Sequence, residues 1–353
     1  MNIFKLLDEA IAHNASDLHL STHSRPLIRV NGSLEPVKDH PVLTKDDLTE
    51  AFAQITTPKE REQFERELEL DSGYTLPEGT RLRCSAAQQR GVLSLAIRIL
   101  PPQIPTIDEL QLPQICKDIV MKLRGLIVIS GPTGSGKTTT MAAMINHLNK
   151  VTTRHVFTIE DPIEYFHSNI DSVITQRELG KDTLGYPQAL KHVLRHDPDV
   201  ILVGEMRDTE TVSAAISVAE TGHLIMTTSQ APYAPQAIER IVDLFPPEQR
   251  YLAQSRLSSL LIAVLCQTLV PRADGSGRIA AVEIMLGNTA VRSLIRDSKI
   301  HQLSNAIRSY RNIGMVTLDE SLVNLYTRHI IDIKTLFAYC SDSEQVEELL
   351  RGR

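Results

Sequence analysis

The sequence predicts an α/β protein in two parts, a small N-terminal α+β domain and a larger C-terminal domain built on a parallel sheet. Three observations support this prediction. From about residue 120 onward, apolar strands alternate with helical segments, which is the pattern of a parallel sheet with crossover helices. Before that point, helices lie between short strands and a pair of longer strands. A proline-rich stretch, LPPQIPTIDELQLP (100–113), separates the two patterns and is typical of a semi-rigid linker.

The N-terminal domain is expected over residues 1–98. Its first element is an amphipathic helix, because apolar residues recur at helical spacing at Ile3, Leu6, Leu7, Ala10 and Ile11. The segments DLHLST and PLIRV follow as strands, and the second turns at Asn31-Gly32. Helical segments near 44–55 and 58–69 come next, the latter highly charged. TRLRCSAAQ and VLSLAIRIL then predict a pair of strands.

A linker is expected over 99–119 and the larger domain over 120–353. The strands of this domain are predicted at LIVIS, HVFTIE, VILVG and HLIMTT, with helical segments between them. The region after 246 is expected to be mostly helical, with a hairpin about Asp274-Gly275. Thr317 and Glu320 form a T-x-x-E capping box that predicts the start of a helix over 318–329.

One segment of the larger domain, LIVISGPTGSGKTTT (126–140), meets the full G-x-x-x-x-G-K-[ST] pattern between a predicted strand and a predicted helix. Its glycines permit a tight loop whose N–H groups point at a polyphosphate, and the helix N-terminus adds partial positive charge. Lys137 can reach the β- and γ-phosphates, and the Thr138 hydroxyl can bind Mg²⁺. The residues expected to bind nucleotide are Gly131, Pro132, Thr133, Gly134, Ser135, Gly136, Lys137, Thr138 and Thr139. The sequence therefore predicts a nucleoside triphosphate and Mg²⁺ site in a RecA-like sheet.

Composition narrows the class of protein. The net charge of −6 and the pI of about 6.1 argue against a dominant nucleic-acid footprint. The four cysteines are scattered without a C-x-x-C pair, so they predict neither a zinc site nor a disulfide framework. The N-terminus lacks the basic start and apolar stretch of a signal peptide. The most apolar segment, LLIAVLC (260–266), is too short to span a bilayer.

Acidic residues follow two of the predicted strands. FTIEDPIEY (157–165) places Glu160, Asp161 and Glu164 after one strand, and DVILVGEMRD (199–208) ends another strand in Gly204-Glu205. Because the carboxyl ends of parallel strands lie beside the phosphate loop, both groups are expected at the same crevice. Hydrolysis requires a group that positions water and support for Mg²⁺, and these carboxylates can supply both.

The motifs together resemble one family over nearly the whole chain, the PilT-type type IV pilus retraction ATPases of the secretion ATPase superfamily. The segments that carry the resemblance occur in the family's order and at similar spacing: ASDLHL (15–20), GPTGSGKTTT (131–140), TIEDPIEY (158–165), QRELGKDTLGY (176–186), LRHDPDVILVGEMRD (194–208), AETGHL (219–224), IERIVDLFP (238–246), AVRSLIRD (290–297) and GMVTLDESL (314–322).

The resemblance implies a cytoplasmic homohexameric ring in which each subunit pairs a PAS-like N-terminal domain with a RecA-like ATPase domain. Nucleotide would lie at the boundary between these domains. ATP hydrolysis would rotate them and act on an inner-membrane platform protein, so that the pilus disassembles and drives twitching motility. The ring would associate with the inner membrane only through the pilus machinery, and no nucleic acid is expected as a partner.

The resemblance also implies roles for individual residues. Lys137 and Thr138 hold phosphate and metal. Glu164 positions the attacking water, and Glu205 holds Mg²⁺ through water or acts with Glu164. His223 takes the first position of the family's histidine box and is predicted as catalytic. Basic positions that approach a neighbouring subunit's phosphates are matched by Arg83, Arg90 and Arg98, whose planar, charged side chains suit phosphate oxygens.

The sequence departs from the family at one position. The histidine box ordinarily continues into T-L-H-T, whereas this chain reads Thr228-Ser229-Gln230-Ala231. Gln230 keeps a donor and an acceptor but never becomes a cation, so we expect a neutral sensor of the γ-phosphate there. The alternative is a degenerate position without a role in turnover.

Several functions remain open from the sequence alone. One alternative is a PilU-like accessory retraction motor that works with a paralogous ATPase. An extension or secretion motor usually carries a tetracysteine module, which the scattered cysteines do not match. A RecA-like nucleic-acid translocase is disfavoured by the acidic pI and by an aromatic content of 4%. A ring component that binds nucleotide without hydrolysing it is the last alternative, because of Gln230.

Overall fold

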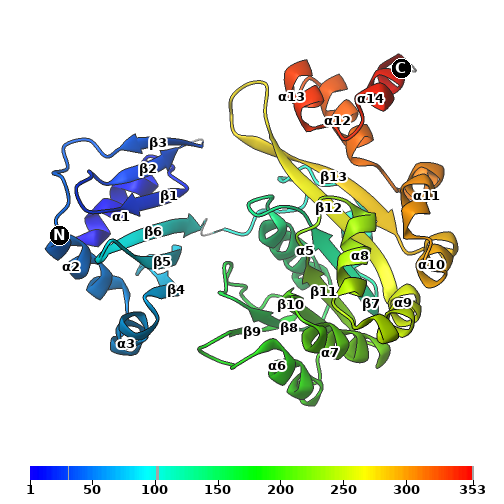
Figure 1. The fold of residues 1–353 in the computed structure, drawn as a ribbon, viewed down its shortest axis with the longest axis horizontal. Coiled ribbons are helices and arrows are strands. Elements are labelled where there is room, and N and C mark those ends of the chain that lie inside the picture. The colour runs from blue at the N-terminus through cyan, green and yellow to red at the C-terminus, as the bar shows by residue number, and fades with distance from the viewer. Residues whose placement is uncertain (31, 101–102, 352–353) are drawn as a thin grey trace. The chain divides into compact units, whose positions relative to one another are not determined.

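The computed structural model describes residues 1–30, 32–100 and 103–351, which divide into two compact units (Figure 1). Unit 1 contains Met1–Gln103 and a short internal segment, Pro162–Phe166. Unit 2 contains Ile104–Asp161 and His167–Arg353. The chain therefore leaves unit 2 after Asp161 and returns to it at His167. Asn31 of the predicted turn, and Pro101 and Pro102 of the predicted linker, lie outside the described residues.

Unit 1 is an antiparallel sheet with three helices. Its strand order is β3-β2-β1-β6-β5-β4. The strands are β1 (Asp17–Leu20), β2 (Leu27–Val30), β3 (Ser33–Pro36), β4 (Glu69–Thr75), β5 (Arg81–Gln89) and β6 (Val92–Leu100). The helices are α1 (Ile3–Ala12), α2 (Lys45–Ile55) and α3 (Pro58–Glu67). The helix predicted from the first apolar residues is confirmed as α1, and its buried face joins the same core as Leu18 and Ile97.

The structure adds two strands to this unit that the sequence reading did not contain, β3 and β4. The charged helix predicted near 58–69 ends at Glu67, because Leu68 takes a left-handed conformation with φ of 63°. The chain then reverses, and β4 pairs with β5 along its length. Local helix signals extended over these residues, and pairing with the next strand, β5, decided their conformation.

Unit 2 is built on a sheet in the order β13-β12-β7-β11-β10-β8-β9. All of these strands run parallel except β13, which is antiparallel to β12. The strands are β7 (Gly125–Ser130), β8 (His155–Glu160), β9 (Val173–Glu178), β10 (Val200–Glu205), β11 (Leu224–Thr228), β12 (Leu261–Pro271) and β13 (Arg278–Leu286). The four predicted parallel strands are confirmed as β7, β8, β10 and β11.

Helices cover both faces of this sheet. They are α4 (Ile115–Val120), α5 (Lys137–Val151), α6 (Tyr186–Val193), α7 (Thr209–Glu220), α8 (Ala234–Asp243), α9 (Pro247–Leu260), α10 (Thr289–Arg296) and α11 (Leu303–Ser309), with short 3₁₀ turns at η1 (Leu194–His196) and η2 (Ile300–Gln302). Alternate residues of β7 divide between the two faces. Ile127 and Ile129 pack in the core that contains α4 and α5, whereas Leu126 and Val128 pack in the core that contains α6 to α11.

The last helices form a separate group at the end of the β12–β13 hairpin, in orange and red in Figure 1. They are α12 (Leu318–Thr327), α13 (Ile333–Tyr339) and α14 (Ser343–Arg351), preceded by the 3₁₀ turn η3 (Arg311–Ile313). Their apolar residues share a core with Val270 and Ile279 of the hairpin. The predicted capping box is confirmed, since Thr317 accepts from the Glu320 amide and Glu320 accepts from the Thr317 amide.

Two expectations about the larger domain differ from the structure. The region after 246 is not mostly helical, because β12 and β13 add two long strands and β12 lies next to β7 in the central sheet. A short apolar run such as LLIAVLC can be a buried helix or a buried strand, and periodicity does not distinguish them. The stretch expected as a linker is packed over much of its length, with Ile107, Leu112 and Cys116 buried against unit 2.

Across residues 1–30, 32–100 and 103–351, we find no helix with the length and apolar character needed to cross a bilayer.

Candidate nucleotide site

The phosphate loop connects the carboxyl end of β7 to the first turn of α5. Gly131, Gly134 and Gly136 have φ values of 140°, 78° and 86°, a region that residues with a side chain rarely adopt. The loop is also tightly surrounded. A Cβ atom on Gly131 would lie 2.3 Å from the backbone oxygen of Gln267, which leaves space for glycine alone. The spacing of glycines in the motif is thus required by both conformation and packing.

Lys137 folds back onto its own loop. Its Nζ atom donates to the backbone oxygens of Gly131 at 2.7 Å and Pro132 at 2.9 Å. Pro132, Thr133 and Gly134 are exposed, so the tip of the loop faces solvent. A phosphate group accepts more strongly from an ammonium than a neutral carbonyl does. A bound nucleotide can therefore draw Lys137 away from these carbonyls.

The sheet order brings Glu205 and Gln230 to the same edge as the phosphate loop. Strand β11 lies between β7 and β10, so the residues after β11 run beside both. The Ser229 amide donates to the Ile129 oxygen of β7 at 3.0 Å. On the other side, Nε2 of Gln230 donates to Oε1 of Glu205 at 2.9 Å. The structure thus joins Gln230, which departs from the family, to Glu205, the carboxylate predicted to support Mg²⁺.

Glu205 has a second partner in Arg207. The Arg207 guanidinium lies 2.7 Å from Oε2 of Glu205, and this hydrogen bond is the main cause that raises the pKa of Arg207. The Glu205 side chain is 17% exposed and that of Arg207 is 70% exposed. Each carboxylate oxygen of Glu205 therefore has its own partner, a neutral amide on Oε1 and an exposed cation on Oε2.

A partly buried tyrosine lies next to this edge. A Cβ atom on Gly204 would lie 2.7 Å from the hydroxyl of Tyr186, so glycine at this position allows the phenol to approach β10. Burial, followed by the charge of Asp161, raises the pKa of Tyr186. The raised pKa keeps the phenol neutral, so its hydroxyl remains a hydrogen-bond donor beside the end of β10.

The acidic stretch after β8 divides between the two units. Glu160 is buried in unit 2, where its Oε1 accepts from Thr158 at 2.6 Å and from Gln176 at 3.1 Å. Glu164 belongs to the segment that packs with unit 1, and its Oε1 lies 3.4 Å from the Arg83 guanidinium. The two carboxylates are therefore held by different surroundings, and Glu164 is the one paired with a predicted arginine finger.

The three predicted arginine fingers are not equivalent. Arg83 on β5 and Arg98 on β6 are direct cross-strand partners, and Nε of Arg98 donates to Asp17 at 2.9 Å. Arg90 lies in the turn that joins these strands, with φ of 51°. Seven residues of strand, roughly 23 Å, separate it from Arg83. The structure groups Arg83 with Arg98 and leaves Arg90 at the other end of the hairpin.

His223 lies at the opposite edge of the sheet from the phosphate loop. It precedes β11, and its backbone oxygen accepts from the Gly125 amide, where β7 begins. Nδ1 of its ring forms a hydrogen bond with the Thr221 hydroxyl at 2.9 Å. A five-residue strand, roughly 16 Å long, separates His223 from the edge that holds the loop. Within one chain, His223 therefore does not contact a phosphate bound there, and the catalytic role predicted for it stays a prediction.

Comparison with known proteins decides the family. The chain matches the type II/IV secretion system protein family over residues 2–324. The chain belongs to this family.

Two of the relatives are type IV pilus ATPases. The type IV pilus retractation ATPase PilT of Pseudomonas aeruginosa is 41% identical over 331 residues, which are 94% of this chain and 96% of the relative. The type IV pilus ATPase PilU of the same organism is 36% identical over 351 residues, which are 99% and 92% of the two chains. A crystal structure of the pilus retraction motor PilT with bound ADP has a TM-score of 0.88 at 38% identity, covering 99% of both chains.

These comparisons confirm the predicted resemblance to the pilus retraction ATPases, the α/β fold class and the assignment of this chain to a class of ATPases. The similar PilT structure contains bound ADP, which supports nucleotide binding by this class of ATPases.

Two residues of this secretion ATPase that the sequence did not single out contact the segments that carry site residues. Gln267 on β12 bonds both the phosphate loop and α5. Arg81 on β5 is 8% exposed, donates to the Ile163 oxygen at 3.2 Å and lies over the Phe166 ring at 5.0 Å. Each contacts a residue more than 80 positions away in the sequence, and no local motif predicts these contacts.

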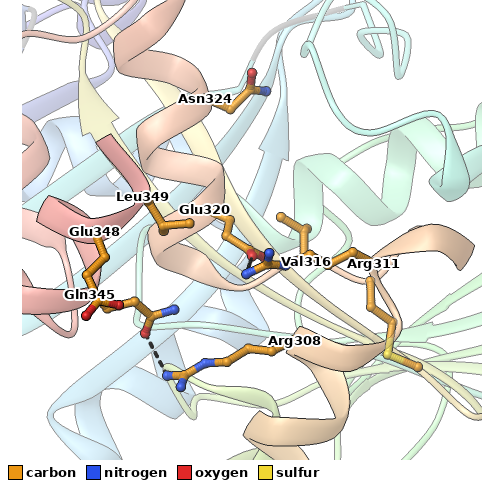
Figure 2. A pocket seen from close by; sticks show the side chains of 9 residues that line it. Arg308, Arg311, Val316, Glu320, Asn324, Gln345, Glu348 and Leu349 are labelled. Carbon is orange, nitrogen blue, oxygen red and sulfur yellow. Dashed lines mark hydrogen bonds and ion pairs between the residues drawn. The ribbon is translucent and has the colours of Figure 1, made fainter. Parts of the chain in front are cut away.

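A separate pocket of about 740 Å³ lies among η3, α11, α12 and α14 (Figure 2). Figure 2 shows Arg308 reaching Gln345, at 2.6 Å. Arg311 forms an ion pair with Glu320, the residue that also caps α12. The arginines of this pocket are thus paired with its own wall, and the phosphate loop does not line it. We assign the nucleotide to the loop.

Proposed function

We propose that this chain is the ATP-hydrolysing subunit of a homohexameric motor that drives type IV pilus retraction. One observation carries the proposal: the phosphate loop and the Gln230–Glu205 pair lie at the same edge of a sheet whose fold matches a pilus retraction motor with bound ADP. This edge can bind a nucleotide polyphosphate, and its carboxylate can assist hydrolysis.

Magnesium fits the donors at this edge. The Thr138 hydroxyl in the first turn of α5 and the Glu205 carboxylate are hard oxygen ligands of the kind that Mg²⁺ prefers. Glu205 remains partly exposed, so a water can lie between it and a metal. When bound, Mg²⁺ would neutralise charge on the β- and γ-phosphates. The chain's own part is to hold phosphate through loop N–H groups and Lys137, and to orient Glu205 through Gln230.

The remaining roles belong to the same proposal. Glu164 positions the attacking water, and Arg83 and Arg98 reach a nucleotide held by a neighbouring subunit. Their present partners, Glu164 and Asp17, are acidic, so a nucleotide phosphate would compete with carboxylates for these guanidinium groups. The ring would be cytoplasmic and would act on an inner-membrane platform protein. An accessory motor is the second candidate, because PilU aligns over 99% of this chain.

A retraction assay tests the proposed function. In a strain that lacks this chain, wild-type protein should restore pilus retraction, and Lys137→Ala should not, because the loop would lose the ammonium that binds phosphate. Restoration that occurs only when a second retraction ATPase is present would favour the accessory motor. Restoration by Lys137→Ala as full as by wild type would exclude a retraction motor driven by this site.

Assembly can be tested by mixing variants. Lys137→Ala removes the phosphate contact within a subunit, whereas Arg98→Ala removes a contact proposed to cross to a neighbour. Each variant alone should be nearly inactive. Their mixture should recover several-fold more ATPase activity than either alone, because some interfaces then combine an intact loop with an intact arginine.

Two controls accompany this experiment. Arg90→Ala, at the far end of the same hairpin, should behave like wild type and should not be needed for rescue. Steady-state ATPase at increasing protein concentration should also rise more than linearly as rings form. A mixture without recovery, together with a monomeric mass under ATP, would count against the ring.

A further inference from the structure

Gln267 is buried against the phosphate loop and uses both ends of its side-chain amide there. The side chain is on β12, the strand next to β7, and the residue is 2% exposed. Its Nε2 donates to the backbone oxygen of Ser135 at 2.5 Å, and its Oε1 accepts from the Thr140 hydroxyl at 2.8 Å. One side chain therefore joins the loop to the first turns of α5.

The backbone of the phosphate loop also lies close to Gln267. A Cβ atom on Gly136 would lie 3.0 Å from Nε2 of Gln267, and one on Gly131 would lie 2.3 Å from its backbone oxygen. These are the two glycines fixed by the nucleotide-binding pattern. Their lack of a side chain allows the loop to rest directly on Gln267, and this contact is made at both ends of the loop.

The bond to Ser135 has a directional consequence for the next peptide. In a planar trans peptide, the C=O of one residue and the N–H of the next point in opposite directions. Because the Ser135 oxygen points at Gln267, the Gly136 N–H points to the side of the loop away from Gln267. Loop N–H groups directed to this side are the ones that hold a phosphate.

We propose that Gln267 is a positioning residue of the phosphate loop, which fixes the Ser135–Gly136 peptide with its N–H directed at a bound nucleotide phosphate. Without this bond the Ser135–Gly136 peptide can rotate. The Ser135 carbonyl oxygen, the negative end of the peptide dipole, can then turn toward the phosphate. The assignment rests on the proposed function only in taking the ligand of the loop to be a nucleotide. It adds a residue that touches no ligand and acts through the backbone.

Nucleotide titrations on the purified full-length chain test this role. Gln267→Met keeps the size of the side chain and removes both hydrogen bonds. It should weaken affinity for ADP and ATP by about 10-fold, the scale of one buried hydrogen bond. Turnover at saturating ATP should fall less than the affinity does, because the loop binds ground state and transition state alike.

A second variant separates positioning from packing. Gln267→Glu places a carboxylate against the Ser135 oxygen at high pH, which repels it. A protonated carboxyl can instead donate to Ser135 and accept from Thr140, as the amide does. Burial favours the neutral form. Affinity relative to wild type should therefore be lowest at pH 8.5 and should recover several-fold at pH 6. Comparing each value with wild type at the same pH removes the contributions of neighbouring groups, among them Lys137, Cys266 and Glu283.

Matched controls make the result decisive. Thr268→Val, on the next position of β12 with its side chain on the opposite face, should leave affinity unchanged. Thr140→Val removes only one of the two bonds and should weaken affinity by a few-fold. The role is overturned if Gln267→Met and Thr140→Val bind nucleotide like wild type, or if Gln267→Glu is equally weak at both pH values while its melting temperature is unchanged. These titrations need no hydrolysis, so a wild-type chain without ATPase activity would remove the proposed function and leave this test intact.

Discussion

Glu205→Ala should bind ATP nearly as well as the wild-type chain and hydrolyse it roughly 100-fold more slowly or worse. The loop and Lys137, which we propose to hold the phosphates, follow β7 and begin α5, so a change at the end of β10 does not alter them. What disappears is the carboxylate that Gln230 and Arg207 hold at this edge. Nucleotide titration and steady-state ATPase on the purified variant measure the two effects separately.

Two further variants define what Glu205 contributes. Glu205→Gln keeps a side-chain oxygen that can accept from Gln230 but has no charge. If charge near the metal matters most, this variant should be nearly as slow as Glu205→Ala. Lys137→Ala is the contrasting change and should weaken ATP binding itself. Turnover of Glu205→Ala within a few-fold of wild type would exclude Glu205 from the hydrolytic step.

The sequence predicted those parts of the site that are specified locally. The phosphate loop lies within ten consecutive positions between a strand and a helix, so its conformation follows from its own glycines and their neighbours. The position of Glu205 also followed, because the end of a parallel strand has a known place relative to the loop. Gln230 was expected at the same edge for the same reason, and the structure places it there against Glu205.

Other features depend on contacts between distant parts of the chain. Gln267 lies 127 positions after Thr140, and its role is visible only once β12 is placed beside β7. Because the region that contains LLIAVLC was expected to be mostly helical, neither β12 nor the position of Gln267 beside the loop was predicted. The position of His223 also depends on the fold. A histidine carried over from a family motif was expected at the site, yet a short strand places it at the other edge of the sheet within this chain.

Glu164 shows why an acidic stretch is not one site. The residues from Glu160 to Glu164 are adjacent in sequence, but the chain passes from unit 2 to unit 1 between Asp161 and Pro162. Glu160 is bonded within the sheet of unit 2, whereas Glu164 is paired with Arg83. A contact pattern of this kind is set by the tertiary fold, and spacing alone could not separate the two carboxylates.

Gln230→Ala should lower kcat by roughly 10-fold or more while nucleotide affinity changes little. The amide of Gln230 is the neutral donor on one oxygen of Glu205, and without it the carboxylate keeps the exposed Arg207 as its ion-pair partner. A carboxylate free to turn toward Arg207 is a poorer support for charge that redistributes in the transition state. Single-turnover hydrolysis and nucleotide titration on this variant measure the two quantities.

The double variant Glu205→Ala/Gln230→Ala tests whether the two residues act as a unit. If Gln230 works through Glu205, the double variant should be no slower than Glu205→Ala alone, because the second change then removes nothing further. Independent roles would instead multiply the two losses. Gln249→Ala, which changes an exposed glutamine on α9, serves as the matched control and should leave turnover unchanged.

Gln230→His restores the residue typical of the family and should remain active. Its activity should depend on pH in a way that the wild-type amide does not, since imidazole gains a proton near neutral pH. Unchanged single-turnover hydrolysis in Gln230→Ala would make the position a degenerate one and would remove it from the site.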